Sequence, residues 1–154
     1  QRSLSEKRFQ ELFLRFSRLV VDEVVAAPWV EEAREFLVQN EKRFKYFIVS
    51  GMPEDELNEI AQRRERDHFF DAVRGSPKDK VTLLGEIMEG YNLRPEKMVF
   101  VGDAETDWYA AQKLNIPFLW RCVPGQIPAL PGYNGPRLPS LRNLDRNLQE
   151  SISL

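Results

Sequence analysis

The sequence predicts an α/β fold, a doubly wound and mainly parallel sheet with helices on both of its faces. Short apolar runs alternate with longer amphipathic stretches, a pattern typical of βαβ units joined by right-handed crossovers. These runs are apolar at successive positions, as expected for strands that are covered on both faces. The chain has 154 residues, enough for one domain with its own core, and shows no sign of a second full domain.

The N-terminal segment predicts one amphipathic helix. Its apolar residues recur at spacings of three and four, which indicates a single buried face. They are Phe9, Leu12, Phe13, Phe16, Leu19 and Val20. The two alanines before Pro28 end this helix. A shorter helix with an acidic first turn is expected at residues 30–37.

The rest of the chain supplies the strands and the helices that cover them. Strands are expected at residues 46–49, 98–101 and 116–120, with further short strands at 69–73 and 138–141. Helices are expected from Pro53 onward and at residues 81–88, 108–114 and 144–152. Residues 123–139 are rich in proline and glycine and predict a long irregular loop.

Composition excludes several classes of function. The net charge is −2, so the overall electrostatics give no support for binding nucleic acid or an anionic membrane. No apolar run approaches the ~20 residues that span a bilayer. The single cysteine, Cys122, has no partner for a disulfide within the chain, and a cytoplasmic location is expected. The chain begins at Gln1 and not at a methionine, from which we expect a trimmed N-terminus.

The most informative segment is residues 102–107, which follow an apolar run and precede an amphipathic stretch. Asp103 and Asp107 lie four residues apart at the carboxyl end of the expected strand, where open α/β sheets bind ligands. Carboxylate oxygens are the ligands that Mg²⁺ prefers, so this segment predicts a magnesium site. The alternative is that both residues only stabilise the positive end of a helix.

Two further segments carry complementary chemistry. Ser50 and Gly51 close one expected strand, and a hydroxyl with backbone N–H groups at such a place can bind phosphoryl oxygens. Lys80 follows a Gly-Ser-Pro turn and can neutralise the same anion. Together with the two aspartates, these residues are the parts of a phosphoryl-transfer site. The alternative for Ser50 by itself is a hydroxyl that bonds to local backbone at the end of a strand. The alternative for Lys80 by itself is a solvated residue at the start of a helix.

These segments resemble three motifs of the haloacid dehalogenase superfamily, in particular its capped phosphatases of the phosphoglycolate phosphatase type. Residues 47–51 match the second motif, residues 75–80 the third and residues 99–107 the fourth. The similarity covers residues 28–122 well. It implies that residues 1–27 are the remnant of a helical cap and that residues 28–154 form the α/β core.

The resemblance also implies a role for each candidate residue. Ser50 would donate a hydrogen bond to the transferring phosphoryl group, with the Gly51 amide beside it. Lys80 would stabilise that group and the nucleophile, and the spacing of the third motif selects Lys80 over the neighbouring Lys78. Asp103 would bind Mg²⁺ directly, and Asp107 would either contact the groups that bind the ion or bind the ion through a water molecule.

One family motif is missing. The superfamily's first motif, an Asp-x-Asp at the end of the N-terminal strand, supplies the nucleophile, and no such segment precedes Ser50. The earlier aspartate, Asp22, lies in helical sequence. In the family, the strand that carries this motif lies in the sheet between those ending at Ser50 and Asp103, so its absence leaves backbone groups unpaired. We therefore expect this chain to be a C-terminal portion, with the missing segment absent or supplied separately, and to be inactive by itself.

The expected function of the complete molecule is Mg²⁺-dependent hydrolysis of a phosphate monoester, a small phosphorylated metabolite, through an aspartyl-phosphate. One alternative is a non-catalytic member of the superfamily that binds phosphate or metal and has a regulatory role. Another is a different doubly wound protein, such as a phosphoacceptor signalling domain, in which Ser50, Lys80 and Asp103 need not converge.

Overall fold

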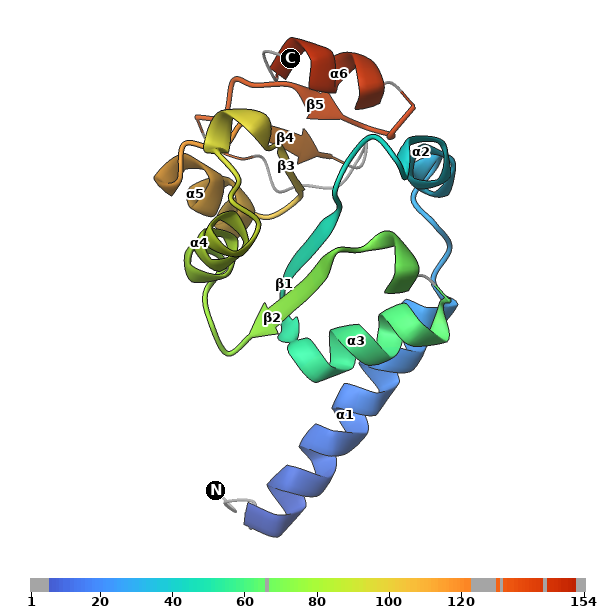
Figure 1. Ribbon diagram of the computed structural model, residues 1–154. Coiled ribbons are helices and arrows are strands. Elements are labelled where there is room, and N and C mark those ends of the chain that lie inside the picture. The colour runs from blue at the N-terminus through green and yellow to red at the C-terminus, as the bar shows by residue number, and fades with distance from the viewer. Residues whose placement is uncertain (1–5, 66, 123–129, 131, 143, 152–154) are drawn as a thin grey trace.

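The computed structural model describes residues 6–65, 67–122, 130, 132–142 and 144–151, and Figure 1 shows their arrangement. Strands and helices alternate, as the sequence predicts. The strands are β1 (Phe47–Pro53), β2 (Ala72–Ser76), β3 (Phe100–Gly102), β4 (Phe118–Arg121) and β5 (Arg137–Leu138). The α-helices are α1 (Glu6–Ala26), α2 (Ala33–Asn40), α3 (Glu54–Arg63), α4 (Lys80–Gly90), α5 (Glu105–Lys113) and α6 (Leu144–Ser151). Short 3₁₀ turns lie at Asp67–Phe69 and Pro95–Lys97.

All strand pairs are parallel, which confirms the α/β fold class. β1 pairs with β2, and β3, β4 and β5 form a second sheet in that order. Within the described residues, β1 and β3 are not paired with each other, so two small sheets stand where the sequence pattern suggests one. This division agrees with the expectation of unpaired backbone groups between the strands that end near Ser50 and Asp103.

The larger sheet is covered on both faces. Phe118 and Trp120 of β4 face one way and pack in a cluster with Leu84 of α4 and Ala110 of α5. Leu119, the residue between them, is fully buried on the opposite face. It belongs to a second cluster, which includes Leu138, Leu144, Leu148, Phe36 and Phe44. The alternation follows from the two-residue period of a strand. Helices on both faces are what a doubly wound sheet requires.

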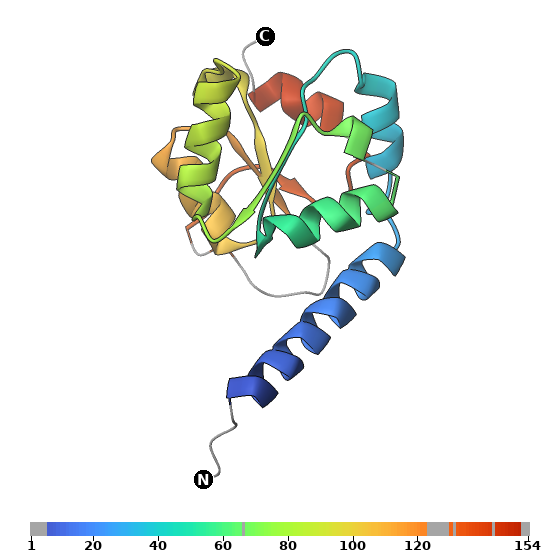
Figure 2. The same cartoon turned by 60° about the horizontal axis from the view of Figure 1, so that its bottom comes forward.

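The expectation of a buried face on the first helix is wrong for the described chain. The helix exists, but its only buried residue is Val21. Phe13 is 55% exposed and Phe16 is 66% exposed, and the helix projects from the body alongside α3 (Figure 2). Helical periodicity marks an apolar face but carries no information about what covers it. The proposed division at residue 27 is not tested by this arrangement.

Several boundaries differ from the sequence prediction. The prediction of a strand at residues 69–73 is wrong in part, because a 3₁₀ turn ends at Phe69 and β2 begins only at Ala72. Asp71 lies between them, and its carboxylate accepts a hydrogen bond from the Tyr46 N–H at 2.9 Å. The edge strand lies at Arg137–Leu138, ahead of the expected 138–141. Of the expected irregular loop, residues 123–129 and 131 lie outside the described residues.

Strand β1 runs further than predicted, to Pro53, so that Ser50 and Gly51 belong to the strand itself. Its register against β2 shifts between Val49 and Pro53. None of the described helices is both long enough and apolar enough to span a membrane.

Candidate active site

The candidate site lies at the carboxyl ends of β1, β2 and β3. Ser50 and Gly51 lie in the last half of β1, Lys80 opens α4 just after β2, and Asp103 and Asp107 follow β3. Parallel strands bring these ends to one edge, which is where open α/β sheets bind ligands. The contacts described below show which of the five residues the fold brings together.

Lys80 and Asp107 form the central contact of this edge. The Lys80 Nζ atom lies 2.5 Å from Asp107 Oδ1, and the two side chains are 18% and 7% exposed. Lys80 Nζ also donates to the Thr106 hydroxyl at 3.3 Å. These contacts join the first turns of α4 and α5, which are far apart in sequence. An ammonium group is therefore held at the carboxyl end of β3.

Asp107 is held in place by its own turn. Its Oδ2 accepts a hydrogen bond from the Ala104 N–H at 3.0 Å, so both carboxylate oxygens have partners. Gly102 makes this approach possible, because a Cβ atom at that position would lie 2.5 Å from the Asp107 Cβ. The glycine before Asp103 is thus required by close packing of Asp107 against the end of β3.

The turn before Lys80 is fixed by a second glycine. A Cβ atom at Gly75 would lie 2.4 Å from the Met52 carbonyl oxygen, so only glycine allows β2 to approach the end of β1 so closely. The Gly75 N–H donates to Glu54 Oε2 at 3.1 Å. Asp79 then caps α4 by accepting from the Thr82 N–H at 2.9 Å, and this hydrogen bond lowers the pKa of the Asp79 carboxyl group. Helix α4 therefore begins where Lys80 can reach across to α5.

The neighbouring lysine takes a different direction. Lys78 Nζ pairs with Glu86 Oε1 at 2.5 Å, and both side chains are largely exposed on the outer surface of α4. The structure thus separates the two lysines that the sequence places two residues apart. Lys80 faces the strand ends and Lys78 does not.

Ser50 and Asp103 lie at the same edge without contacting Lys80. The Ser50 hydroxyl accepts a hydrogen bond from the Met52 N–H at 3.2 Å, and Gly51 is exposed. Asp103 is exposed and, within the described part of the chain, makes no hydrogen bond or ion pair. The structure therefore brings Lys80 together with Asp107, and it leaves Ser50 half-buried and Asp103 exposed, apart from that pair.

Sequence reasoning missed Thr106. Its hydroxyl is the second partner of Lys80, and its place directly before Asp107 in the acidic segment was the signal that could have identified it.

The carboxylates at this edge can supply some, but not all, of the ligands of a Mg²⁺ ion. The described residues contain no group of three His, Cys, Asp or Glu side chains that could enclose a metal ion. Mg²⁺ does not need such a cage, because it is commonly held by one or two carboxylates together with water and substrate phosphate. Asp103 has an exposed carboxylate with unused oxygens, whereas both Asp107 oxygens are engaged. Of the two aspartates at this edge, Asp103 is therefore the one whose carboxylate could hold the ion.

Comparison with known proteins identifies the family. The family model described as haloacid dehalogenase-like hydrolase matches residues 3–121. The chain belongs to this family. The match includes all five candidate residues, and it extends through the first helix, which residue periodicity alone could not assign. None of the curated proteins compared with the chain matches it.

Solved structures of haloacid dehalogenase-like proteins share the fold. A phosphatase of this superfamily from Thermococcus onnurineus has a TM-score of 0.71 at 18% identity, over 90% of this chain and 66% of its own. A superfamily hydrolase of subfamily IA from Geobacter sulfurreducens has a TM-score of 0.68 at 22% identity, over 83% and 60%. A protein described as a predicted phosphoglycolate phosphatase from Haemophilus somnus has a TM-score of 0.66 at 19% identity, over 78% and 56%.

These likenesses establish the fold and the extent of the match. The chain spans 56–66% of the length of these three solved structures. The remaining length of those proteins has no counterpart in residues 1–154.

Proposed function

We propose that the complete protein is a Mg²⁺-dependent phosphate monoester hydrolase that acts on a small phosphorylated metabolite in the cytoplasm. The observation that supports this most is the contact between Lys80 and Asp107 at the carboxyl end of β3, in a chain of the haloacid dehalogenase-like hydrolase family. A nearly buried ammonium group at a strand edge is well placed to neutralise a phosphoryl group.

Each residue has a distinct proposed role. The Lys80 ammonium group would neutralise the phosphoryl oxygens and orient the nucleophile, and Asp107 and Thr106 would hold it in position. Ser50 and the Gly51 N–H would donate hydrogen bonds to the same oxygens. Asp103 would bind Mg²⁺, which when present supplies positive charge that offsets the charge on the reacting oxygens.

The nucleophile is proposed to be an aspartate outside residues 1–154. Its carboxylate oxygen would bond to phosphorus while the bond from phosphorus to the alcohol oxygen breaks. The alcohol oxygen would take a proton from a general acid that also lies outside residues 1–154, and that group would regain the proton from the attacking water. Water would then attack the aspartyl-phosphate, releasing inorganic phosphate and restoring the carboxylate. The sum is one ester and one water giving one alcohol and one phosphate. Residues 1–154 alone are expected to show no turnover.

A panel of phosphate monoesters, offered to the full-length gene product with and without Mg²⁺, tests this proposal. We expect metal-dependent release of phosphate, reduced by Lys80→Met by at least about 100-fold in kcat. Lys78→Met is the matched control, because this lysine pairs with Glu86 on the outer surface, and it should keep its activity. No activity on any ester, in a full-length protein that contains an Asp-x-Asp segment, would contradict the proposal.

A non-catalytic regulatory protein is the second candidate. Residues 1–154 contain no Asp-x-Asp segment, and Lys80 is already neutralised by Asp107. Titration calorimetry with phosphate and Mg²⁺ separates the two candidates, because this one predicts binding without turnover in the full-length protein.

A further inference from the structure

Strand β1 carries a bulge close to its carboxyl end. Its parallel ladder with β2 is regular up to Val49 and resumes at Pro53. Between these paired positions β1 has residues 50–52, whereas β2 has only Gly75. A bulge leaves its extra residues out of the ladder and bends the strand, and bulges are common beside active sites. The candidate phosphate-binding groups of β1 therefore lie on a segment that the ladder does not hold in place.

The bulge leaves backbone N–H groups that must find partners outside the ladder. Gly75 is buried and has no paired residue in β1. Its N–H donates instead to the Glu54 carboxylate, with 3.1 Å between the nitrogen and Oε2. The Met52 N–H, on the bulge itself, donates to the Ser50 hydroxyl at 3.2 Å. Because a buried N–H without a partner costs about 1–3 kcal/mol, Glu54 satisfies a group that the bulge would otherwise leave orphaned.

Glu54 and Gly75 are also packed closely against each other. A Cβ atom at position 75 would lie 2.7 Å from the Glu54 backbone nitrogen and 2.8 Å from its Cα atom. Arg74 adds a contact from the preceding position of β2, because its Nη1 atom lies 3.6 Å from Glu54 Oε1. One carboxylate oxygen of Glu54 therefore holds the backbone of β2, and the other lies near a β2 side chain. The end of β1, the start of α3 and the end of β2 meet at this residue.

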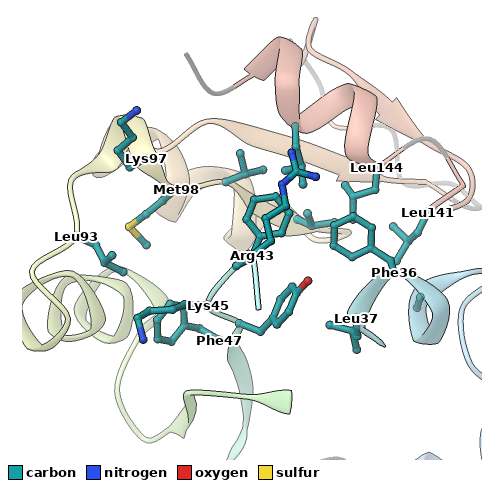
Figure 3. A pocket seen from close by; sticks show the side chains of 16 residues that line it. Phe36, Leu37, Arg43, Lys45, Phe47, Leu93, Lys97, Met98, Leu141 and Leu144 are labelled. Atoms are coloured by element: carbon teal, nitrogen blue, oxygen red, sulfur yellow. The ribbon is translucent and has the colours of Figure 1, made fainter. Parts of the chain in front are cut away.

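The opposite end of β1 is packed less closely. An apolar cavity of about 420 Å³ borders it, with Phe47 and Met98 among its lining residues and Phe36 contributed by α2 (Figure 3). Within the described chain, β1 has a strand partner only on its β2 side. The placement of residues 50–52 relative to Lys80 therefore depends on the contacts between β1, β2 and the start of α3.

We propose that Glu54 is a positioning residue of the candidate active site. By binding the Gly75 N–H, its carboxylate holds the bulge of β1 at a fixed distance from the turn that leads to Lys80. The inference rests on the proposed function, in which Ser50, Gly51 and Lys80 contact the same phosphoryl group. A displacement of about 1 Å between such groups can lower a rate about 100-fold, so a contact that fixes their spacing affects the reaction without touching the substrate.

Two substitutions separate the hydrogen bond from the charge. Glu54→Gln keeps an acceptor oxygen at the same reach and loses the charge. Glu54→Asp keeps the charge, but its side chain is one methylene shorter and cannot reach the Gly75 N–H from the same backbone position. Asp55→Asn is the matched control, because Asp55 is the next residue of the same acidic helix turn and is exposed. It removes one charge from the start of α3 without removing the contact to β2.

The test uses the full-length gene product and measures amide exchange at Gly75 together with ester hydrolysis. We expect Glu54→Asp to speed exchange of the Gly75 amide at least about tenfold, because the N–H loses its acceptor. The same variant should lower kcat at least about tenfold and leave KM within about twofold, as expected when groups that act in the transition state are displaced. Glu54→Gln should restore slow exchange and most of kcat. Asp55→Asn should behave as the unchanged protein.

Other outcomes overturn the inference. Equal losses in Glu54→Gln and Glu54→Asp would show that the charge matters and not the hydrogen bond. Unchanged exchange at Gly75 in Glu54→Asp would show that Glu54 does not hold this amide. Lowered stability of Glu54→Asp with unchanged kcat would show a structural role only.

Failure of the proposed function is distinguishable from failure of this inference. If the unchanged protein hydrolyses no ester, the enzyme proposal fails, and the affinity for inorganic phosphate, measured by titration calorimetry, replaces kcat. A loss of affinity of at least about tenfold in Glu54→Asp, restored in Glu54→Gln, would support the positioning role. Equal affinities in all variants, or no binding in any of them, would overturn it.

Discussion

The Arg64 side chain lies across the end of helix α1, with its Nη1 atom 2.6 Å from the Val24 carbonyl oxygen and 2.9 Å from that of Ala27. Arg64 directly follows the last residue of α3, and its guanidinium group lies 5.0 Å from the centre of the Trp29 ring. A cation at the negative end of a helix satisfies carbonyl groups that have no partner within the helix. The end of α1 is thus held to α3 by one side chain.

Arg64→Met should loosen α1 without unfolding the core. Loss of charge-assisted hydrogen bonds at a partly exposed site is expected to cost about 1–2 kcal/mol, confined to α1. Amide exchange should accelerate in the last turns of α1 and stay unchanged in α4 and α5. Equal acceleration throughout the chain would show that α1 is part of the cooperative core.

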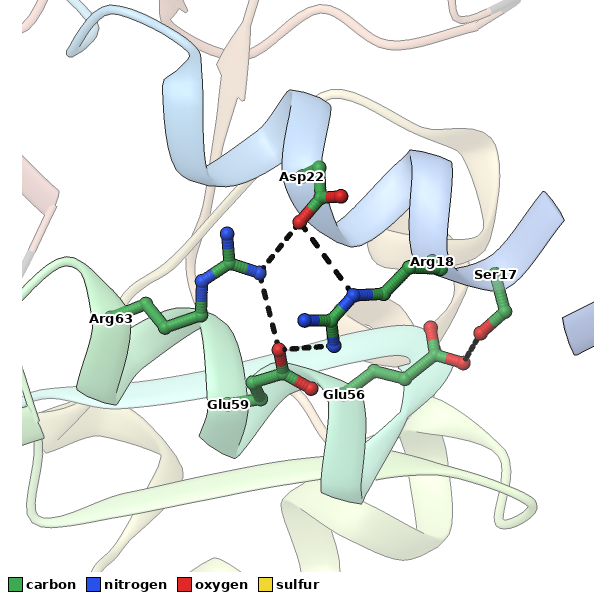
Figure 4. Close-up of polar contacts among 6 residues, drawn as sticks. All are labelled: Ser17, Arg18, Asp22, Glu56, Glu59 and Arg63. Carbon is green, nitrogen blue, oxygen red and sulfur yellow. Dashed lines mark hydrogen bonds and ion pairs between the residues drawn. The ribbon is translucent and has the colours of Figure 1, made fainter. Parts of the chain in front are cut away.

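Salt should weaken the contact between α1 and α3 through a different group of residues. Asp22 and Arg18 of α1 form ion pairs with Arg63 and Glu59 of α3, as Figure 4 shows. All four side chains are 35% exposed or more, so their attraction is screened by salt. Raising the salt concentration should therefore speed exchange in α1. Asp22→Asn combined with Glu59→Gln is expected to remove this salt dependence, and a retained dependence would assign it elsewhere.

The Lys80–Asp107 pair should be strongly coupled. Either Lys80→Met or Asp107→Leu leaves a nearly buried charge unpaired and is expected to lower the free energy of unfolding by about 2–4 kcal/mol. The double variant should recover much of that loss, as denaturant unfolding of all four proteins in a double-mutant cycle would measure. Lys78→Met is the control and should change stability by less than about 1 kcal/mol, because its partner Glu86 is exposed. Additive single effects would contradict the coupling.

Gly102→Ala should disturb Asp107 directly. The added Cβ atom would meet the Asp107 Cβ at 2.5 Å, so the aspartate or the strand end must shift, at a cost of about 1–3 kcal/mol. Gly85→Ala in α4 is the matched control, because nothing lies within 4 Å of the added atom and alanine favours a helix. It is expected to be neutral or slightly stabilising. Equal destabilisation by both changes would show that close packing against Asp107 is not the reason why position 102 needs a glycine.

Tyr46 should make the protein less stable in alkaline solution. Burial raises the pKa of its hydroxyl from 10 to about 12, with the nearby Asp145 acting in the same direction. The unfolded chain ionises first, so the stability that this group contributes is complete below pH 10 and is lost as the pH rises to about 12. Tyr46→Phe should weaken this loss in denaturant unfolding at high pH. An unchanged pH dependence would show that Tyr46 is not its source.

Local sequence determined the type and order of most elements. The strands around Ile48 and Val101, the helix opened by Lys80 and the acidic turn after Gly102 follow from apolar runs, turn residues and caps, all set by neighbours in sequence. The choice of Lys80 over Lys78 came from the resemblance to the superfamily's third motif, and in the structure Lys80 pairs with Asp107 whereas Lys78 pairs with Glu86. The start of β2 differs from the sequence prediction because Asp71 forms hydrogen bonds with Tyr46 and Tyr91, which are distant in sequence.

Only the tertiary structure decided which groups meet. Whether Asp107 would face Lys80 or solvent and whether Phe13 and Phe16 would be covered both depend on segments far apart in the chain. A periodic pattern shows that a face is apolar or that a turn is acidic. The free energy gained by burial or pairing, however, depends on both of the surfaces that come into contact. The sequence by itself therefore determined the elements and the chemistry at their ends, and the folded chain determined that Lys80 is held by Asp107, whereas the Ser50 hydroxyl bonds to the Met52 N–H.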